Sequence, residues 1–185
     1  AAEDNRKGIP TQAVLCLETG GVRLQEANLG LAAIADIHAA IVDLRRYVPV
    51  IGIVAGTVGC FGGMSIAAAL CSYLIVTREA RLGLNGPQVI EQEAGIDEYD
   101  SRNRPFIWSL TGGEARERNG FVDKLVDDSL AAVKAATVEC MEKGKPASLR
   151  NERYDEFLTR LNAFDTRQQA DAKLTAELFA KGNRS

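Results

Sequence analysis

The sequence has little of the side-chain chemistry on which most enzymes depend. Its 185 residues include a single histidine, His38, and four cysteines that form no C-x-x-C pair. This spacing indicates neither a zinc site nor a disulfide framework, so we expect free thiols and a cytoplasmic protein. No apolar run approaches the roughly 20 residues that a membrane-spanning helix needs.

An excess of charge is also missing, since 22 lysines and arginines stand against 25 aspartates and glutamates. A net charge of −3 argues against non-specific binding to nucleic acid, which requires a basic surface. Apolar residues make up 46% of the chain, enough for the core of one domain. We expect residues 1–145 to form that domain and residues 146–185 to form a polar helical extension. Residues 1–8 resemble the end of a helix, so we also expect that upstream sequence is missing.

Apolar strands that alternate with helical segments predict an α/β protein with a mostly parallel sheet. Strands are expected at 11–18, 50–56, 73–78, 80–86 and 120–128. Helices are expected at 25–47, from the glycines near 62 to residue 72, at 86–95, around 106–110 and 114–119, and at 129–144, with two more towards the end. Glycine-rich turns follow the first two strands. Because carboxyl ends of parallel strands meet at one edge, these turns should face one cavity.

The stretch "GTVGCFGGMSIAAAL", residues 56–70, has four glycines in eight positions and no acid, base or imidazole. A P-loop is excluded because no lysine follows these glycines, and the spacing does not match G-x-G-x-x-G either. Both common phosphate-binding motifs are therefore absent, which disfavours nucleotide binding.

Catalysis by side chains finds equally little support in the sequence. Residues 63–67 miss the serine-nucleophile motif G-x-S-x-G by one position, because Ala67 replaces the last glycine. His38 lies on the apolar stripe of the helix at 25–47, so we interpret it as a packed residue. A hydrolase with Ser65 as nucleophile stays a weaker alternative. The acidic residues at 91–100 lack a calcium-loop pattern and are interpreted as a solvated face, so we expect no metal site.

With side chains disfavoured, backbone amide groups are the remaining candidates for catalysis. The loops at 20–22 and 61–63 can both present amide N–H groups to one cavity, and the start of a helix adds partial positive charge. Such amides stabilise an oxyanion that develops in a transition state, which suits enolate-forming reactions of thioesters. The alternative is that the glycines only allow strand and helix to pack closely, and the residues alone leave both possibilities open.

The segments "ETGGVRLQEANLGL", "GTVGCFGGMSIAAALCSYLIVTREARLGLNGPQVIEQ" and "YDSRNRPFIWSLTGGEAR" carry a more specific signal. They resemble the beta subunit of biotin-independent malonate decarboxylase, a relative of acyl-CoA carboxyltransferase beta subunits. The carboxyltransferases have a similar GGAR-x-QE loop, matched at 20–26, and a Gly-Gly helix start, matched by Gly62 and Gly63. Their GPRVIEQ-like element is matched at 86–92, where Gln88 replaces arginine. The resemblance is strong over residues 1–127 and thin beyond 145, and about the first third of the family's length is expected to be absent.

The resemblance implies a crotonase-like (ClpP/crotonase) fold with repeated ββα-type units and polar C-terminal helices. It implies that malonyl-S-acyl carrier protein loses CO2 and becomes acetyl-S-acyl carrier protein through an enolate. Gly62 and Gly63 are then expected to form an oxyanion hole through their backbone. The substrate cleft is expected to be lined by Gly20, Gly21, Val22, Arg23, Gly59 and Phe61.

The same resemblance implies the cofactors and partners. No cofactor would be bound directly, because the substrate is carried on the phosphoribosyl-dephospho-CoA arm of the acyl carrier protein, and this step would need neither biotin nor metal. The expected partners are a homologous gamma subunit, the acyl carrier protein and an alpha acyl-transferase subunit. Two alternatives stay open, namely a biotin-dependent acyl-CoA carboxyltransferase subunit and a non-catalytic scaffold subunit of such a complex.

Overall fold

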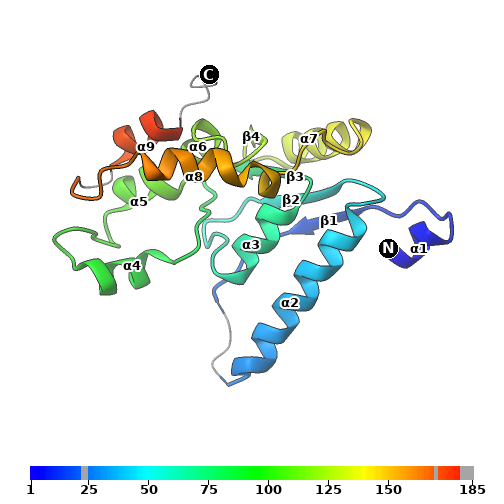
Figure 1. Cartoon of the computed structure of the whole chain (residues 1–185), viewed down its shortest axis with the longest axis horizontal. Helices are drawn as coiled ribbons and strands as arrows, with labels where there is room; N and C mark the ends of the chain where they lie inside the picture. Colours follow the sequence, from blue (N-terminus) through cyan, green and yellow to red (C-terminus); the bar gives the residue numbers. More distant parts are fainter. Residues whose placement is uncertain (22–24, 169–170, 180–185) are drawn as a thin grey trace.

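The computed structural model describes residues 1–21, 25–168 and 171–179, and its centre is a parallel sheet (Figure 1). The strand order is β1-β2-β3-β4, and each neighbouring pair runs parallel. The strands are β1 (Ala13–Cys16), β2 (Val50–Val54), β3 (Tyr73–Thr77) and β4 (Lys124–Val126). The predicted α/β class with a parallel sheet is confirmed.

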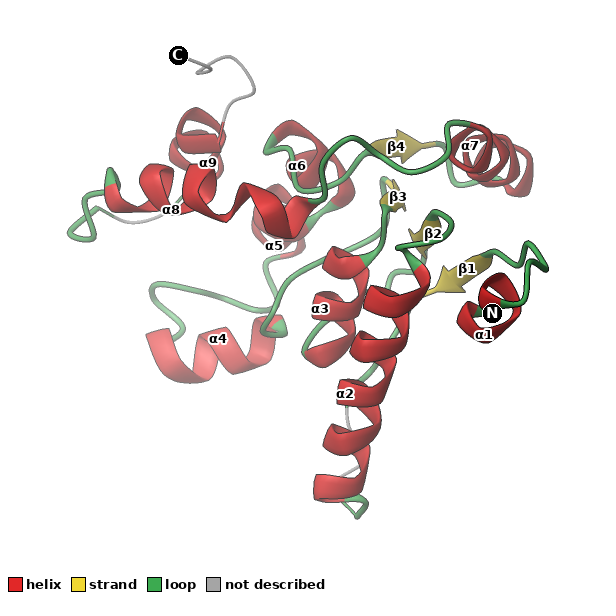
Figure 2. Cartoon of the chain, turned by 45° about the vertical axis from the view of Figure 1, so that its right-hand side comes forward, coloured by secondary structure: helices red, strands yellow, loops and turns green. Residues whose placement is uncertain are grey.

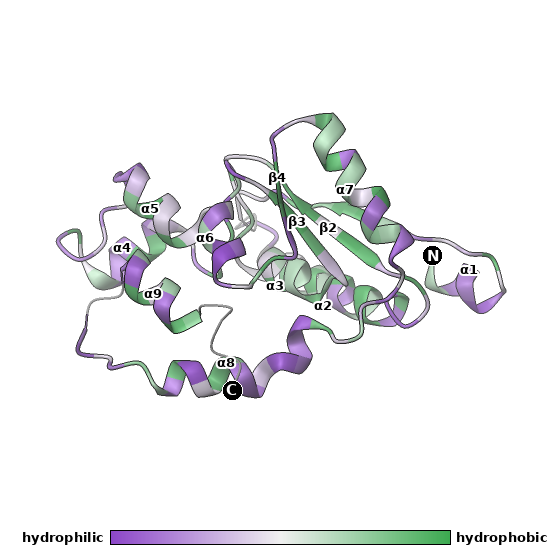
Figure 3. Cartoon of the chain, turned by 90° about the horizontal axis from the view of Figure 1, so that it is seen from above, coloured by the Kyte–Doolittle hydropathy of each residue, from purple (hydrophilic) through white to green (hydrophobic). Residues whose placement is uncertain are grey.

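Helices cover both faces of this sheet. Figure 2 shows α2 (Ala27–Leu44) and α3 (Gly63–Leu70) on one face and α7 (Leu130–Glu142) on the other. Successive strand residues point to opposite faces, so β2 and β3 need apolar residues at every position. Val50 and Leu74 pack towards α2 and α3, whereas Ile51 and Ile75 pack towards α7. The strands accordingly form the hydrophobic band at the centre of Figure 3.

Local sequence signals set several helix ends. The side-chain oxygen of Asn103 accepts the N–H of Phe106 at 3.2 Å, and that of Ser129 accepts the N–H of Ala132 at 3.2 Å, so each residue caps a helix. The helix expected at 86–95 begins at a proline and ends before Gly95, as these start and stop signals predict. The remaining helices are α1 (Ala2–Arg6), α4 (Pro87–Ala94), α5 (Arg104–Thr111), α6 (Gly113–Arg118), the 3-10 helix η1 (Arg150–Arg153), α8 (Tyr154–Asn162) and α9 (Ala172–Phe179).

The expected polar helices near the C-terminus are present as α8 and α9. They are held to the rest of the chain by an aromatic cluster, in which the ring of Phe121 lies 5.2 Å from that of Phe157 and 5.1 Å from that of Phe179. Arg150 adds an ion pair with Asp123 at 2.7 Å. Across the described ranges, no helix combines the length and the hydropathy needed to cross a bilayer.

The predicted strand at 80–86 is wrong. This segment forms only single-residue bridges, one between Leu82 and Cys60 and one between Arg81 and Gly112. Its partner Cys60 stands just before the turn at Gly62, so the pairing cannot extend into a ladder. The strand predicted at 120–128 shortens to β4, because β4 pairs with only the last three residues of β3.

The predicted apolar face of α2 is only partly buried. Ile41 and Leu44 lie in the core, but Leu31 is 59% exposed and Ile37 is 37% exposed. Figure 1 shows the reason, since the N-terminal half of α2 projects beyond the sheet. On this part of the helix Ile34 packs on the start of α3, whereas Leu29 and Leu31 are exposed to solvent.

Candidate active site

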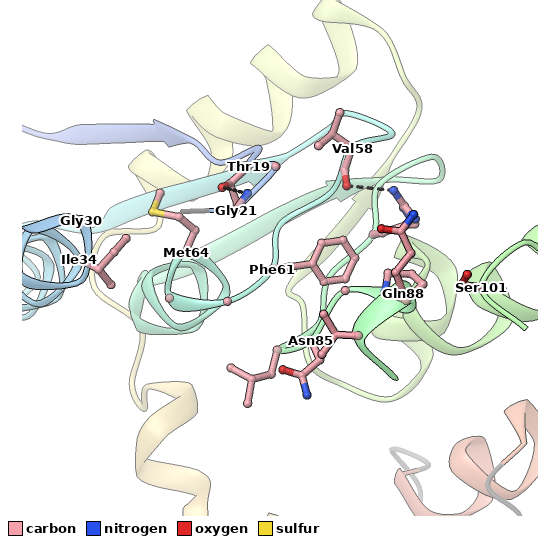
Figure 4. A pocket seen from close by; sticks show the side chains of 18 of the residues that line it. Thr19, Gly21, Gly30, Ile34, Val58, Phe61, Met64, Asn85, Gln88 and Ser101 are labelled. Atoms are coloured by element: carbon pink, nitrogen blue, oxygen red, sulfur yellow. Dashed lines mark hydrogen bonds between the residues drawn. The ribbon is translucent and has the colours of Figure 1, made fainter. Parts of the chain in front are cut away.

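The loops that follow β1, β2 and β3 meet at the carboxyl edge of the sheet and enclose a cavity of about 720 Å³. The predicted site residues that line it are Gly20, Gly21, Phe61, Gly62 and Gly63. The expectation that both glycine-rich turns face one cavity is therefore confirmed. In Figure 4, Met64 and Phe61 lie between Ile34 of α2 and Gln88 at the start of α4.

Three other predicted site residues are not among the described residues that line the cavity. Val22 and Arg23 lie outside the described residues. Gly59 is buried and is not part of the cavity wall, but its carbonyl accepts the N–H of Thr19 at 2.9 Å. Gly59 thus joins the loop after β1 to the loop after β2.

Sequence reasoning missed one side of the cavity. Residues 84–89, at the start of α4, form part of the wall together with Ser101, Gly30 and Ile34. The motif at 86–92 was a signal that this segment has a function. Its place on the wall, however, depends on how α4 sits relative to β3, which no local pattern encodes.

Two charged side chains fix the loop between β2 and α3. Glu18 accepts the N–H of Val58 at 3.0 Å, and its carboxylate fills the space beside Gly56, where a Cβ would come within 1.6 Å. On the other side, Arg81 donates to the carbonyl oxygens of Thr57 at 2.7 Å and of Val58 at 3.0 Å. The loop is therefore held from the segment after β1 and from the segment after β3.

The guanidinium of Arg81 is held by hydrogen bonds on one side and by aromatic rings. Besides those carbonyl groups, it lies over the rings of Trp108, at 4.7 Å from the centroid, and Phe61, at 5.6 Å. Burial and then the nearby charge of Arg104 lower the pKa of Arg81. This cation organises the wall of the cavity, and its Nε and Nη2 donate to backbone carbonyls.

Gly62 makes the turn that starts α3. Its φ of 62° and ψ of −143° are accessible to glycine, and its N–H donates to the carbonyl of Leu84 at 2.7 Å. Gly63 and Met64 follow as the first residues of the helix, where N–H groups have no partner within the helix. Neither N–H finds a protein acceptor in the part of the chain that the structure describes. The amides of Gly63 and Met64 are therefore free donors at the start of α3, which lines the cavity.

Helix α2 lies directly against this helix start. A Cβ on Gly63 would stand 2.6 Å from Cγ2 of Ile34, so only glycine allows the approach. His38, one turn further along α2, donates from Nε2 to the carbonyl of Gly63 at 2.8 Å. The hydroxyl of Ser65 donates to the carbonyl of Gly62 at 2.7 Å. Both side chains thus bind backbone, and the pairing of serine with histidine that a hydrolase requires is not formed.

The acidic residues at 91–100 do not converge on this cavity. Within the described ranges, no three His, Cys, Asp or Glu side chains gather as metal ligands do. Glu91 instead binds Ser101, and hydrogen bonds from its side chain and its N–H lower the pKa of Glu91. The absence of a metal stays a prediction.

Comparison with known proteins identifies the family. No family model matches the sequence. The structure of a Pseudomonas malonate decarboxylase hetero-tetramer in complex with malonate aligns with a TM-score of 0.94 and 65% identity, over 97% of this chain and 65% of the other. The Pseudomonas MdcD-MdcE hetero-dimer aligns with a TM-score of 0.80 and 62% identity, over 88% of this chain and 67% of the other. The chain belongs to the malonate decarboxylase subunit family.

More distant relatives are carboxyltransferases. The malonyl-S-ACP:biotin-protein carboxyltransferase MADC of Malonomonas rubra is 42% identical over 130 residues, which cover 70% of this chain and 41% of that protein. The transcarboxylase 12S structure aligns with a TM-score of 0.57 and 31% identity, over 69% of this chain and 24% of the other. The chain thus spans less than two thirds of the length of several of its relatives.

The packed loop between β2 and α3 predicts a pattern of thiol reactivity. Burial raises the pKa of the Cys60 thiol to about 12 and that of Cys71 to about 11, and it raises the pKa of Cys140 as well. Because the thiolate is the reactive form, iodoacetamide at neutral pH should label exposed Cys16 and spare the other three. Peptide mass spectrometry reads the result, and the urea-unfolded chain, labelled at all four, is the control. Rapid labelling of Cys60 in the folded chain would contradict the packed loop.

Proposed function

We propose that this chain is the beta subunit of malonate decarboxylase and that, with a gamma-type subunit, it decarboxylates malonyl-S-acyl carrier protein. The observation that carries the proposal is the pair of unpartnered amides, Gly63 and Met64, on the wall of a cavity in a chain of this family. The matched chain, which is 65% identical, belongs to a hetero-tetramer whose crystal structure is in complex with malonate, and this supports the substrate class.

In the proposed reaction the bond between the α-carbon and the carboxylate breaks. Its electron pair moves into the α-carbon and on to the thioester oxygen, so that CO2 leaves and an enolate remains. The α-carbon then takes a proton from water or an acid group and becomes the methyl group of acetyl thioester. Negative charge therefore grows on the thioester oxygen, and the amides of Gly63 and Met64 are placed to donate to it.

Gly62 has a different part in this proposal from Gly63. The N–H of Gly62 already donates to Leu84, so Gly62 contributes the backbone turn and Gly63 with Met64 contributes the donors. Gly20 and Gly21 also line the cavity, and the N–H of Gly21 donates to the hydroxyl oxygen of Thr19 at 3.1 Å. Their contact with substrate, like that of Phe61, Val22 and Arg23, remains a proposal.

The electrostatics of the wall suit the loss of CO2. A carboxylate leaves more readily when it is not held by a strong ion pair, because its charge disappears from that end of the molecule. Among the described residues that line the cavity, the one cation is Arg81, and two of its three guanidinium nitrogens donate to backbone carbonyls. This arrangement supports decarboxylation more than tight binding of the substrate carboxylate.

The finer features implied by the family are part of the same proposal. We propose a crotonase-like fold with ββα-type units, supported by the likeness to transcarboxylase 12S, and a division into residues 1–145 and 146–185. The substrate is proposed to arrive on the phosphoribosyl-dephospho-CoA arm of an acyl carrier protein, with an alpha subunit that transfers the acyl group. Four free cysteines support a cytoplasmic location.

The main alternative is a carboxyltransferase that passes the carboxyl group to biotin. The name of the Malonomonas relative, a malonyl-S-ACP:biotin-protein carboxyltransferase, favours this alternative. In both reactions the carboxyl group leaves the malonyl thioester and an enolate forms, and only the destination of the carboxyl group differs. The two functions differ in whether free CO2 is released without biotin.

Release of CO2 from malonyl-S-acyl carrier protein by the purified complex separates these alternatives. We expect release to continue at an unchanged rate when avidin is added, because the proposed reaction passes no group to biotin. The control is a biotin-dependent carboxylase, which avidin stops under the same conditions. Loss of release with avidin would instead support the carboxyltransferase.

Substitution of Gly63 tests the oxyanion proposal. Gly63→Val pushes a side chain against Ile34 and moves the amides away from the cavity, so kcat should fall by about 100-fold or more while the complex still assembles. Ala135→Val, on the exposed side of α7 across the sheet, introduces the same side chain away from the site and is the matched control. Size-exclusion chromatography checks assembly. Unchanged turnover of Gly63→Val would contradict the oxyanion assignment, and loss of assembly instead would favour a scaffold.

The exposed part of α2 is proposed as the surface for the gamma-type subunit. Leu29 is 74% exposed, Leu31 59% and, on neighbouring α3, Ile66 is 44% exposed, so these helices present an apolar patch to solvent. Gly30 and Ile34 of the same helix line the cavity. A subunit that covers α2 would therefore also close one side of the cavity, and the MdcD-MdcE hetero-dimer shows that a relative pairs with a second chain.

A charge at this patch should weaken pairing. Leu31→Asp places a carboxylate where the partner is proposed to bury leucine, and we expect the dissociation constant of the heterodimer to rise by about tenfold or more. Leu130→Asp, at an 84% exposed leucine on the opposite face of the sheet, is the matched control and should leave it unchanged. Isothermal titration calorimetry measures both. Equal affinity of the two variants would remove α2 from the interface.

A further inference from the structure

The one histidine of the chain hydrogen-bonds to the backbone at the start of α3, next to the amides proposed as donors. Nε2 of His38 donates to the carbonyl oxygen of Gly63 at 2.8 Å, across 25 residues of sequence. A carbonyl oxygen only accepts, so Nε2 carries the proton of this bond. His38 is half-buried between α2 and α3, and one turn before it on α2 Ile34 packs on the same glycine.

The bonded carbonyl belongs to the same peptide unit as the amide of Met64. The structure contains no cis peptide bond in its described ranges, so this C=O and this N–H point in opposite directions. A donor that grips the oxygen therefore fixes the direction of the N–H on the other side of the plane. It also withdraws electron density through the peptide resonance, which makes that N–H a stronger donor.

The preceding peptide has a matching arrangement. Its oxygen, on Gly62, accepts from the hydroxyl of Ser65 at 2.7 Å and from the N–H of Ser65 at 3.0 Å. Its N–H belongs to Gly63, which has no protein acceptor in the described chain. These two consecutive peptides at the start of α3 thus each combine a free N–H with an oxygen that accepts from a side chain.

We propose that His38 is a positioning residue of the reaction, which orients and polarises the Gly63–Met64 peptide so that the N–H of Met64 donates to the developing enolate oxygen. The inference rests on the proposed function, in which Met64 is already a donor, and adds His38 behind that donor. His38 touches no reacting atom, and its effect passes through one peptide plane. An apolar residue would satisfy the packing between α2 and α3 equally well, but the Gly63 oxygen would then keep only its hydrogen bond within α3.

Two substitutions separate positioning from packing. His38→Phe keeps a ring of similar size without a donor, whereas His38→Gln carries an amide nitrogen as many bonds from Cα as Nε2. In the complex with its partner, we expect kcat of His38→Phe to fall by about tenfold or more, with KM changed by less than about twofold. His38→Gln should recover most of the loss. Wild-type kcat in His38→Phe, or an equal loss in both variants, would overturn the proposal.

A spectroscopic measurement tests the same link without turnover. The chain has two methionines, Met64 and Met141, so labelling with 15N-methionine gives two amide signals. Loss of the bond to the Gly63 carbonyl should shift the 15N signal of Met64 to lower frequency in His38→Phe, and His38→Gln should restore it. Met141 lies in α7 on the far face of the sheet and is the internal control.

CO2 release tests the proposed function, and the 15N signal of Met64 tests the role of His38 separately. If the wild-type complex releases no CO2, the proposed function fails, while the Met64 signal still decides whether His38 polarises this peptide. An unmoved Met64 signal in His38→Phe overturns the role of His38 and leaves the decarboxylase proposal standing on Gly63.

Discussion

The approach of α2 to the backbone at Gly63 is the contact on which the rest of the site depends. A side chain at residue 63 would collide with Ile34, so the two helices can lie this close only at a glycine. The same closeness brings His38 within hydrogen-bond distance of the Gly63 carbonyl. Because of this contact, α2 and α3 pack together on one face of the sheet and the start of α3 lies at the cavity wall. The same contact lets His38 hold the Gly63–Met64 peptide.

The loops around this contact are fixed by groups that take no part in the proposed chemistry. Glu18 and Arg81 hold the loop after β2 from opposite sides, and Arg116 of α6 donates to the carbonyl of Leu82 at 2.7 Å. The segment after β3 can in turn accept the N–H of Gly62 through Leu84. Preorganisation of this kind is what main-chain donors require, because they stabilise a transient charge only if they need not move to meet it.

The elements that could be predicted are those whose signals are local. Strands β2 and β3 follow from unbroken apolar runs, since a parallel strand between two helical layers is buried on both faces. Helix α4 follows from its proline and glycine. The false strand at 80–86 has the same kind of composition as a true one, but its partner turns away at Gly62 after one bridge. A pattern within one segment cannot report where the partner segment ends.

The site was predictable only to the level of its loops. The glycines at 20–21 and 62–63 indicated main-chain donors, and the edge of the sheet indicated that they meet. Which amides are free depends on Leu84 and Thr19, residues whose contacts arise from tertiary structure. The role of His38 is hidden for the same reason, because its partner lies 25 residues away and on another helix.

The central claim is that main-chain amides of this cavity stabilise an enolate oxygen. It is tested most directly by comparing two ligands of the assembled complex, acetyl thioester and the nitronate form of a nitroacetyl-type thioester, whose planar, negatively charged oxygens resemble the enolate. A site built for the enolate should bind the nitronate at least about 100-fold more tightly than the neutral acetyl thioester, as measured by their dissociation constants. Equal dissociation constants would contradict the account.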